Sequence, residues 1–148
     1  MIYLGADHRG FEAKNTILKF LKANNLEVKD VGAYSHDPED DFNDFAITVA
    51  RNVRRDRESC GILICGSGIG MALQANRFKG VRAIASTDNR IVEIARAHDN
   101  VNVLCLSADF LSMEEMQTLV RTFLSTRFSN EPKYIHRIVR LDEREDYA

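Results

Sequence analysis

The sequence predicts an α/β fold: a three-layer, Rossmann-like, doubly wound parallel sheet of about five strands, followed by a C-terminal helical tail. Two observations carry this prediction. Short apolar runs alternate with amphipathic segments along the 148 residues, as in folds whose parallel strands are joined by helices. The run Gly61-Ile62-Leu63-Ile64 is apolar without a break, which is typical of a central strand buried on both faces. At this length we expect one domain spanning residues 1–148.

The expected elements follow one another along the chain. The apolar runs predict strands at residues 1–6, 26–31, 61–64, 81–86 and 101–106. The strongest helical stripe recurs at i, i+3, i+4, i+7 and i+11, and its members are Phe42, Phe45, Ala46, Val49 and Val53. Weaker stripes predict three more helices, with the members Ile17, Leu18 and Leu21; Ile91, Ile94, Ala95 and His98; and Met113, Met116, Val120, Phe123 and Leu124. Residues 71–76 are good helix formers and predict a fifth helix.

The end of the chain carries two further signals. Ser112 and Glu115 form a capping-box signature at the start of the last helix of the alternation. The tail, residues 130–148, lies outside the alternation and has one helical stripe, Ile135, Ile138 and Val139, among many charges. We expect an amphipathic tail of this kind to pack on a partner subunit, with packing on its own domain as an equal alternative.

Composition excludes several classes of function. The formal net charge is −2, from 20 basic and 22 acidic residues without a basic block, so nucleic acid and membrane surfaces are not expected partners. The three cysteines, Cys60, Cys65 and Cys105, lack the spacing of a disulfide framework or a zinc site and suit a reducing compartment. No apolar run approaches the ~20 residues of a membrane span. We therefore expect a cytoplasmic protein.

The stretch Cys65-Gly66-Ser67-Gly68-Ile69-Gly70 is the strongest candidate for a functional site. It places a thiol where the central strand ends and a glycine-rich turn opens a helix, so that backbone N–H groups and the helix start favour an anion and a thiolate there. The alternatives are a loop for a cofactor phosphate and an inert core cysteine. A dinucleotide fingerprint would need a glycine at Met71, a cysteine phosphatase would need an arginine there, and a P-loop lysine is absent.

The first predicted strand ends at a second polar group. It delivers Asp7-His8-Arg9-Gly10 to the carboxyl edge of the sheet, where ligands of such folds bind. Asp7 could instead cap the helix that follows. The acidic loop at residues 35–41 is expected to be solvated except at its last residues.

Several motifs together resemble one known family. Asp7-His8-Arg9-Gly10-Phe11, the run from Gly61 to Ala85, His98 and Asn102-Val103-Leu104 are similar, in collinear order over nearly the whole chain, to the type B ribose-5-phosphate isomerases and the related galactose-6-phosphate isomerase subunits. The resemblance implies an aldose–ketose isomerase that converts ribose 5-phosphate to ribulose 5-phosphate through a cis-enediolate. Such a reaction needs a base, an anion hole and a proton relay, and it implies neither a metal nor a cofactor.

The resemblance also implies roles for individual residues. Cys65 would be the base, and Asp7 would move a proton between the sugar oxygens. His98 would help to open the furanose ring. The backbone of the turn would hold the enediolate, with Ser67 replacing the usual threonine, and its members are Gly66, Gly68, Ile69 and Gly70. The positions that would contact the rest of the sugar phosphate are His8, Arg9, Asp99, Lys133 and Arg137, of which His8 and Arg137 match the phosphate ligands.

The chain departs from the family pattern at four places. Phe42 replaces a tyrosine, Asp99 stands where an asparagine amide is usual, Asp109 replaces an arginine, and Lys133-Tyr134 replaces an Arg-His pair. Lysine cannot bind a phosphate through two parallel hydrogen bonds as arginine does. The alternatives are therefore an isomerase of another aldose, such as allose or galactose 6-phosphate, and a sugar-phosphate binding protein without turnover.

One expectation follows from the geometry of the predicted fold and does not depend on the family resemblance. In a doubly wound sheet, the helix that carries His98 runs back from the carboxyl edge, and about ten helical residues span about 15 Å. His98 should therefore end at the opposite edge from Cys65 of its own subunit. We predict a homodimer, or a tetramer of such dimers, whose site is shared, with His98 and Arg137 supplied by the second subunit.

Overall fold

The computed structural model describes residues 1–143 and contains the predicted three layers. The strands are β1 (Ile2–Ala6), β2 (Val28–Asp30), β3 (Cys60–Cys65), β4 (Ala83–Ala85) and β5 (Val103–Ser107). The helices are α1 (Phe11–Ala23), α2 (Phe42–Arg55), α3 (Ile69–Ala75), α4 (Asn89–Asp99), α5 (Met113–Ser125) and α6 (Pro132–Asp142). All strand pairs are parallel, in the order β2-β1-β3-β5-β4. The predicted fold class is confirmed.

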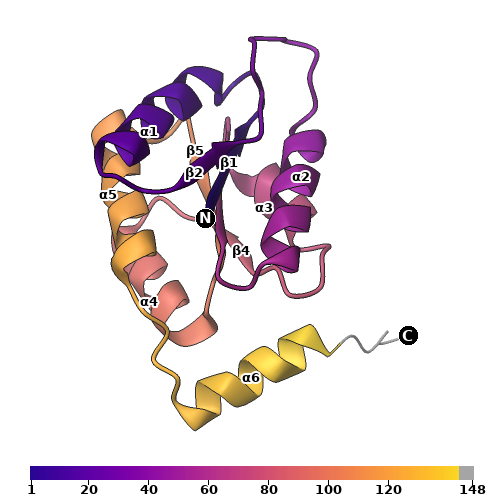
Figure 1. Cartoon of the computed structure of the whole chain (residues 1–148), viewed down its shortest axis with the longest axis vertical. Helices are drawn as coiled ribbons and strands as arrows, with labels where there is room; N and C mark the ends of the chain where they lie inside the picture. Colours follow the sequence, from indigo (N-terminus) through magenta and orange to yellow (C-terminus); the bar gives the residue numbers. More distant parts are fainter. Residues whose placement is uncertain (144–148) are drawn as a thin grey trace.

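The helices cover both faces of the sheet. Helices α1, α4 and α5 lie on one face, and α2 and α3 lie on the other (Figure 1). Along β3 the side chains alternate between the two faces of the sheet. Ile62 and Ile64 pack in the core under α1, α4 and α5, whereas Leu63 and Cys65 pack in the core under α2 and α3. Cys65 therefore ends the central strand on the side of α2 and α3.

The predicted helix α4 is present, but only part of its predicted apolar stripe faces the core. Val92 and Ala95 are buried, whereas Ile91 and Ile94 are 51% and 48% exposed. Neighbouring positions on a helix differ by about 100° in direction, so a short stripe can be assigned to the wrong face. The two isoleucines leave an apolar surface on the outside of the subunit.

The outer strands are shorter than predicted. Strand β2 has three residues where six were expected, and so has β4. Each lies at an edge of the sheet and pairs with a single neighbour, so fewer of its backbone groups are held by a ladder. The capping box of α5 is confirmed, because Ser112 Oγ accepts from the Glu115 amide at 3.1 Å and Glu115 Oε2 accepts from the Ser112 amide at 2.7 Å.

The tail forms α6, which lies apart from the three layers and contacts α4 (Figure 1). None of its residues is buried, and Ile135, Val139 and Leu141 are largely exposed. Residues 144–148 of the predicted tail lie outside the described part of the chain. No helix within residues 1–143 combines the length and apolarity that crossing a membrane requires.

Candidate active site

The site lies between β1 and β3, where the order of the strands in the sheet changes direction. Strands β1 and β3 are neighbours, and the chain proceeds from them toward opposite edges of the sheet. Ala6 is in register with Ile64, so the next residues, Asp7 and Cys65, lie side by side at the carboxyl edge. Gly10 permits this approach, because a Cβ at that position would lie 2.3 Å from the carbonyl oxygen of Ile64.

Asp7 is buried and organises the turn after β1. Its Oδ1 accepts from the amides of Arg9 at 2.9 Å and Gly10 at 3.1 Å, while Oδ2 accepts no hydrogen bond from residues 1–143. The N-cap of α1 is Gly10, so Asp7 is not the cap of that helix. Burial raises the pKa of the Asp7 carboxyl, and the two amides partly oppose this shift.

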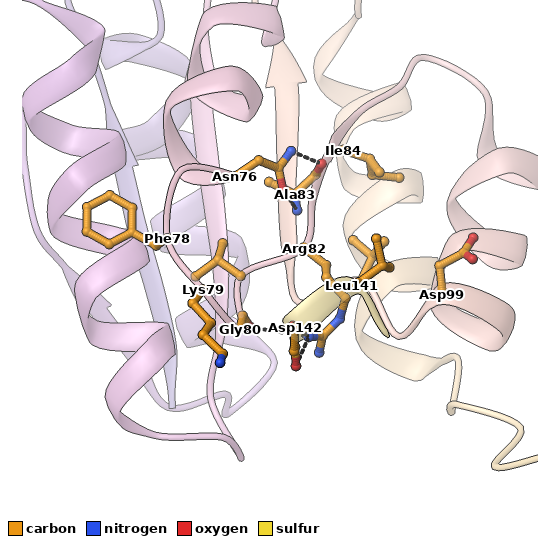
Figure 2. Close-up of a pocket in the computed structure, with 12 residues that line it drawn as sticks. Asn76, Phe78, Lys79, Gly80, Arg82, Ala83, Ile84, Asp99, Leu141 and Asp142 are labelled. Atoms are coloured by element: carbon orange, nitrogen blue, oxygen red, sulfur yellow. Dashed lines mark hydrogen bonds and ion pairs between the residues drawn. The ribbon is translucent and has the colours of Figure 1, made fainter. Parts of the chain in front are cut away.

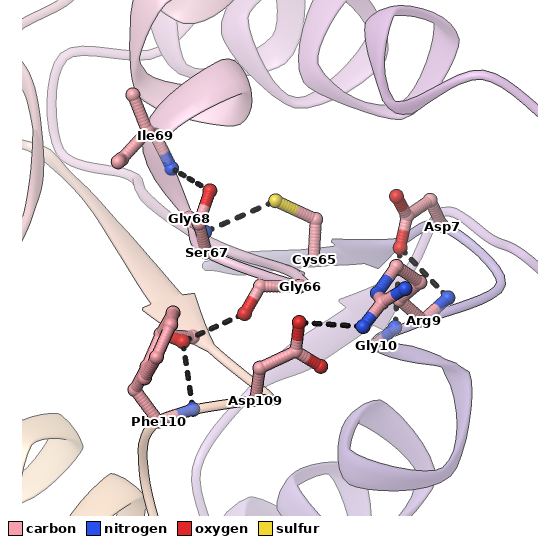
Figure 3. Close-up of polar contacts among 11 residues, drawn as sticks. Asp7, Arg9, Gly10, Cys65, Gly66, Ser67, Gly68, Ile69, Asp109 and Phe110 are labelled. Atoms are coloured by element: carbon pink, nitrogen blue, oxygen red, sulfur yellow. Dashed lines mark hydrogen bonds and ion pairs between the residues drawn. The ribbon is translucent and has the colours of Figure 1, made fainter.

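Cys65 is 5% exposed, and its sulfur belongs to the turn that follows it. The amide of Gly68 donates to Cys65 Sγ at 3.1 Å (Figure 3). Gly68 adopts φ +79°, a conformation that L side chains rarely adopt. This left-handed residue turns the chain back so that its own N–H points at the sulfur.

Fewer backbone amides of the Cys65 turn are available to a ligand than the sequence suggested. The Ile69 amide donates to Ser67 Oγ at 3.2 Å, so that amide and the Gly68 amide are already engaged. The amides of Gly66, Ser67 and Gly70 donate to no acceptor in the described part of the chain. These are the three N–H groups of the turn that a bound oxyanion can use.

Strand β5 and the turn after it hold the carbonyl side of the Cys65 turn. Ser107 Oγ donates to the Gly66 carbonyl at 2.6 Å, and the Asp109 amide donates to the same oxygen at 3.0 Å. The Ala108 amide donates to the Cys65 carbonyl at 2.8 Å. Because its carbonyls are fixed toward β5, the turn keeps its free amides on the other side. Sequence reasoning missed Ser107, which carries no motif.

Arg9 and Asp109 form an ion pair at the mouth of this turn. Arg9 Nη2 lies 2.5 Å from Asp109 Oδ2, and a Cβ on Gly66 would meet Arg9 Nε at 2.7 Å and Asp109 Oδ2 at 2.9 Å. The carboxylate at position 109, a departure from the family pattern, is thus neutralised by Arg9 rather than left facing an anionic ligand.

His8 lies beside Asp7 and is held by Asp40, the last residue before the N-cap of α2. Among the described residues, Asp7, His8 and Asp40 are the one group whose possible metal-ligand atoms lie within 4.8 Å of one another. His8 Nδ1 and Asp40 Oδ1 are hydrogen bonded to each other, so these atoms serve an internal contact. Sequence analysis left Asp40 without a role.

Phe42, another departure from the family pattern, lies beside Gly70 at the end of the Cys65 turn. It opens α2, and a Cβ on Gly70 would lie 2.8 Å from the Phe42 ring. The ring therefore packs against the Cα of Gly70, at the position where the family's tyrosine would offer a hydroxyl.

The remaining predicted residues gather on α4 and α6. His98 stacks on Tyr134 with ring centroids 4.4 Å apart and planes at 11°, and the cations of Lys133 and Arg137 lie 4.8 and 5.8 Å from the Tyr134 ring. We call His98, Lys133, Tyr134 and Arg137 the tail cluster. Asp99 lines a separate cavity of about 550 Å³ that lies among Arg82, Leu141 and Asp142 (Figure 2).

The tail cluster does not meet the residues around Cys65, which we call the carboxyl-edge cluster: Asp7, His8, Arg9, Cys65 and the turn 66–70. The loop after α4 lies at the amino end of β3, because the Gly61 amide donates to the Asn102 carbonyl at 2.8 Å. Strand β3 has six residues, a span of about 17–20 Å. One subunit therefore presents the two clusters at opposite edges of its sheet.

The chain matches known proteins over nearly its full length. Residues 2–141 match the family described as Ribose/Galactose Isomerase. A probable ribose-5-phosphate isomerase B of Mycoplasma pneumoniae is 41% identical over 127 residues, covering 86% of this chain and 84% of the relative. A ribose-5-phosphate isomerase B of Mycobacterium tuberculosis is 33% identical over 144 residues, covering 97% and 89%.

Solved structures agree with these relatives. Ribose-5-phosphate isomerase B from Mycoplasma genitalium, crystallised with bound ribulose 5-phosphate, superposes with a TM-score of 0.92 at 37% identity, covering 95% of this chain and 93% of that one. The enzyme from Thermotoga maritima gives a TM-score of 0.91 at 35% identity, with 97% of both chains covered. The chain therefore belongs to the Ribose/Galactose Isomerase family, as the resemblance of its motifs predicted.

Proposed function

We propose that this chain interconverts ribose 5-phosphate and ribulose 5-phosphate, with Cys65 as the base. The observation that carries the proposal is the position of Cys65 Sγ, beside Asp7 and at the start of a turn with free amides at Gly66, Ser67 and Gly70. The bound ribulose 5-phosphate in the Mycoplasma genitalium relative supports this choice of substrate.

The proposed reaction needs only proton transfers. The Cys65 thiolate removes the proton from C2 of the open-chain aldose, and the electrons move through C1 to the carbonyl oxygen to give a cis-enediolate. The three free amides stabilise the negative oxygen. Asp7 carries a proton from O2 to O1, and the Cys65 thiol returns its proton to C1, which completes the ketose. The raised pKa of Asp7 suits a carboxyl that both accepts and donates a proton.

Ring opening and phosphate binding are assigned to the tail cluster of a second subunit. His98 would assist ring opening, and Lys133 and Arg137 would bind the phosphate together with His8. The exposed isoleucines of α4 and the unburied helix α6 support a homodimer that brings the tail cluster of one copy to the carboxyl edge of the other.

Phe42 favours one second candidate. A phenyl ring over Gly70 removes a hydroxyl from the sugar site, which would suit a different aldose such as allose 6-phosphate or galactose 6-phosphate.

Exchange in heavy water tests both candidates. The purified protein is incubated in D2O with each sugar phosphate, and deuterium at C2 is followed by NMR. Exchange and ketose formation with ribose 5-phosphate are expected. Exchange only with a hexose 6-phosphate would replace the substrate, and binding without exchange of any of them would indicate a sugar-phosphate binding protein.

A further inference from the structure

Asp40 holds His8 at two points, although 32 positions separate the two residues. Asp40 Oδ1 accepts from the His8 backbone amide at 2.9 Å and lies 2.7 Å from His8 Nδ1. One bond fixes the backbone of the turn after β1, and the other fixes the rotation of the imidazole. A single carboxylate oxygen thus determines where the ring of His8 lies.

The rest of Asp40 is unusual for a residue of an acidic loop. Its side chain is 11% exposed, and Oδ2 is buried without a hydrogen-bond partner in the described part of the chain. Asp37 and Glu39 in the same loop are exposed. Withdrawing a carboxylate from water costs free energy unless a partner compensates, and the partner here is His8.

We propose that Asp40 is a positioning residue for the reaction, and that it holds the His8 imidazole with Nδ1 on the carboxylate and Nε2 free for the anionic group of the substrate. This inference rests on the proposed function. Within the described residues, Nε2 has no partner and the His8 side chain is 28% exposed, so the free nitrogen remains accessible.

The surrounding charges support a cationic ring. The hydrogen bond to Asp40 raises the pKa of His8, and the charge of Asp7 acts in the same direction, while partial burial and the charge of Arg9 oppose it. The ring of His36 packs edge-on against His8 with centroids 6.3 Å apart and is a further titratable group that faces it. His8 therefore keeps its positive charge to a higher pH than a free histidine, which suits the binding of a phosphate.

The experiment compares Asp40→Asn with Glu39→Gln, an exposed change in the same loop. NMR of the imidazole nitrogens, recorded without sugar, follows the titration of His8 in each protein. We expect the midpoint for His8 to fall in Asp40→Asn and to stay unchanged in Glu39→Gln. The KM for ribose 5-phosphate should rise about tenfold in Asp40→Asn, the loss of one charge-assisted hydrogen bond, with a smaller change in kcat. Competition by inorganic phosphate should weaken by a similar factor.

A double variant separates positioning from a general effect on the fold. In a protein that already carries His8→Ala, Asp40→Asn should change the KM by less than twofold. The proposal would be overturned if the increases in KM from His8→Ala and Asp40→Asn multiplied in the double variant. It would also be overturned if the His8 titration were unchanged in Asp40→Asn. Failure of the proposed function would give a different result. The unmodified protein would then exchange no sugar phosphate, although the midpoint of the His8 titration would still fall in Asp40→Asn.

Discussion

The carboxyl-edge cluster and the tail cluster differ in how they are held. Asp7 and Cys65 are each 5% exposed; Asp7 follows β1 and Cys65 ends β3, and both strands lie inside the sheet. Lys133 and Arg137 are exposed on a helix without a buried residue, and His98 is fixed mainly by stacking on Tyr134. The first cluster is finished within one subunit, whereas the second is presented outward. Under the proposed function, this difference would place proton transfer in the core of one subunit and leave substrate binding to an interface between subunits.

The largest expected effect breaks the first cluster. Cys65→Ala should lower kcat about 10³–10⁴-fold, because the change removes the proposed base. Cys105→Ala is the matched control, since it removes a buried thiol from the same core on the neighbouring strand. Each change should cost about 1 kcal/mol of stability, which thermal unfolding can measure. Isomerase activity in Cys65→Ala close to that of the control would remove Cys65 from the mechanism.

The next prediction tests whether the two clusters meet across subunits. Cys65→Ala and His98→Asn should each be poorly active alone. After the two proteins are dissociated together and reassembled, half of the dimers are mixed and each has one intact site, so activity should return to about a quarter of the unmodified level. If the activity of the reassembled mixture stays equal to the sum of the activities of the two separate variants, the complete site lies within one subunit.

A smaller effect is expected at the mouth of the turn. Arg9→Ala leaves Asp109 unpaired beside the site, so the KM for ribose 5-phosphate should rise about tenfold. Adding Asp109→Asn removes that carboxylate and should recover most of the loss. Stability should change by less than about 1 kcal/mol, because both side chains are exposed. A double variant no better than Arg9→Ala would mean that Arg9 itself binds the substrate.

The smallest effect concerns stability and pH. The folded-state pKa of Asp7 is raised above its ordinary value of 3.8, so its favourable contribution is present below that value and is lost as the pH rises through the folded pKa. Above the folded-state pKa, the buried ionised carboxylate lowers the stability of the folded protein. Asp7→Asn keeps an acceptor for the two amides and should raise the Tm by about 2–4 °C at pH 7 while abolishing activity. The gain should shrink as the pH falls toward 4, and a Tm equal to or below that of the unmodified protein at pH 7 would contradict this account.

Local patterns in the sequence predicted the fold and the position of the Cys65 turn. The unbroken apolar run in β3 and the apolar stripe on α2 predict which residues are buried, and the glycines after Cys65 predict a turn. Asp40 and Ser107 could not be found in this way, because each acts on a residue 32 or 41 positions away. The same holds for Asp109, whose opposite charge to the family's arginine is compensated by Arg9, 100 positions earlier.

The three thiols differ in a way that offers a practical use. Burial raises the pKa of Cys60 to about 11 and also raises the pKa of Cys105, so both remain protonated near neutral pH. Alkylating reagents react with thiolates and not with protonated thiols. A small reagent such as iodoacetamide should therefore spare Cys60 and Cys105, so that any label incorporated reports on Cys65. The amount of label incorporated would then count the competent sites in an assembly of any size.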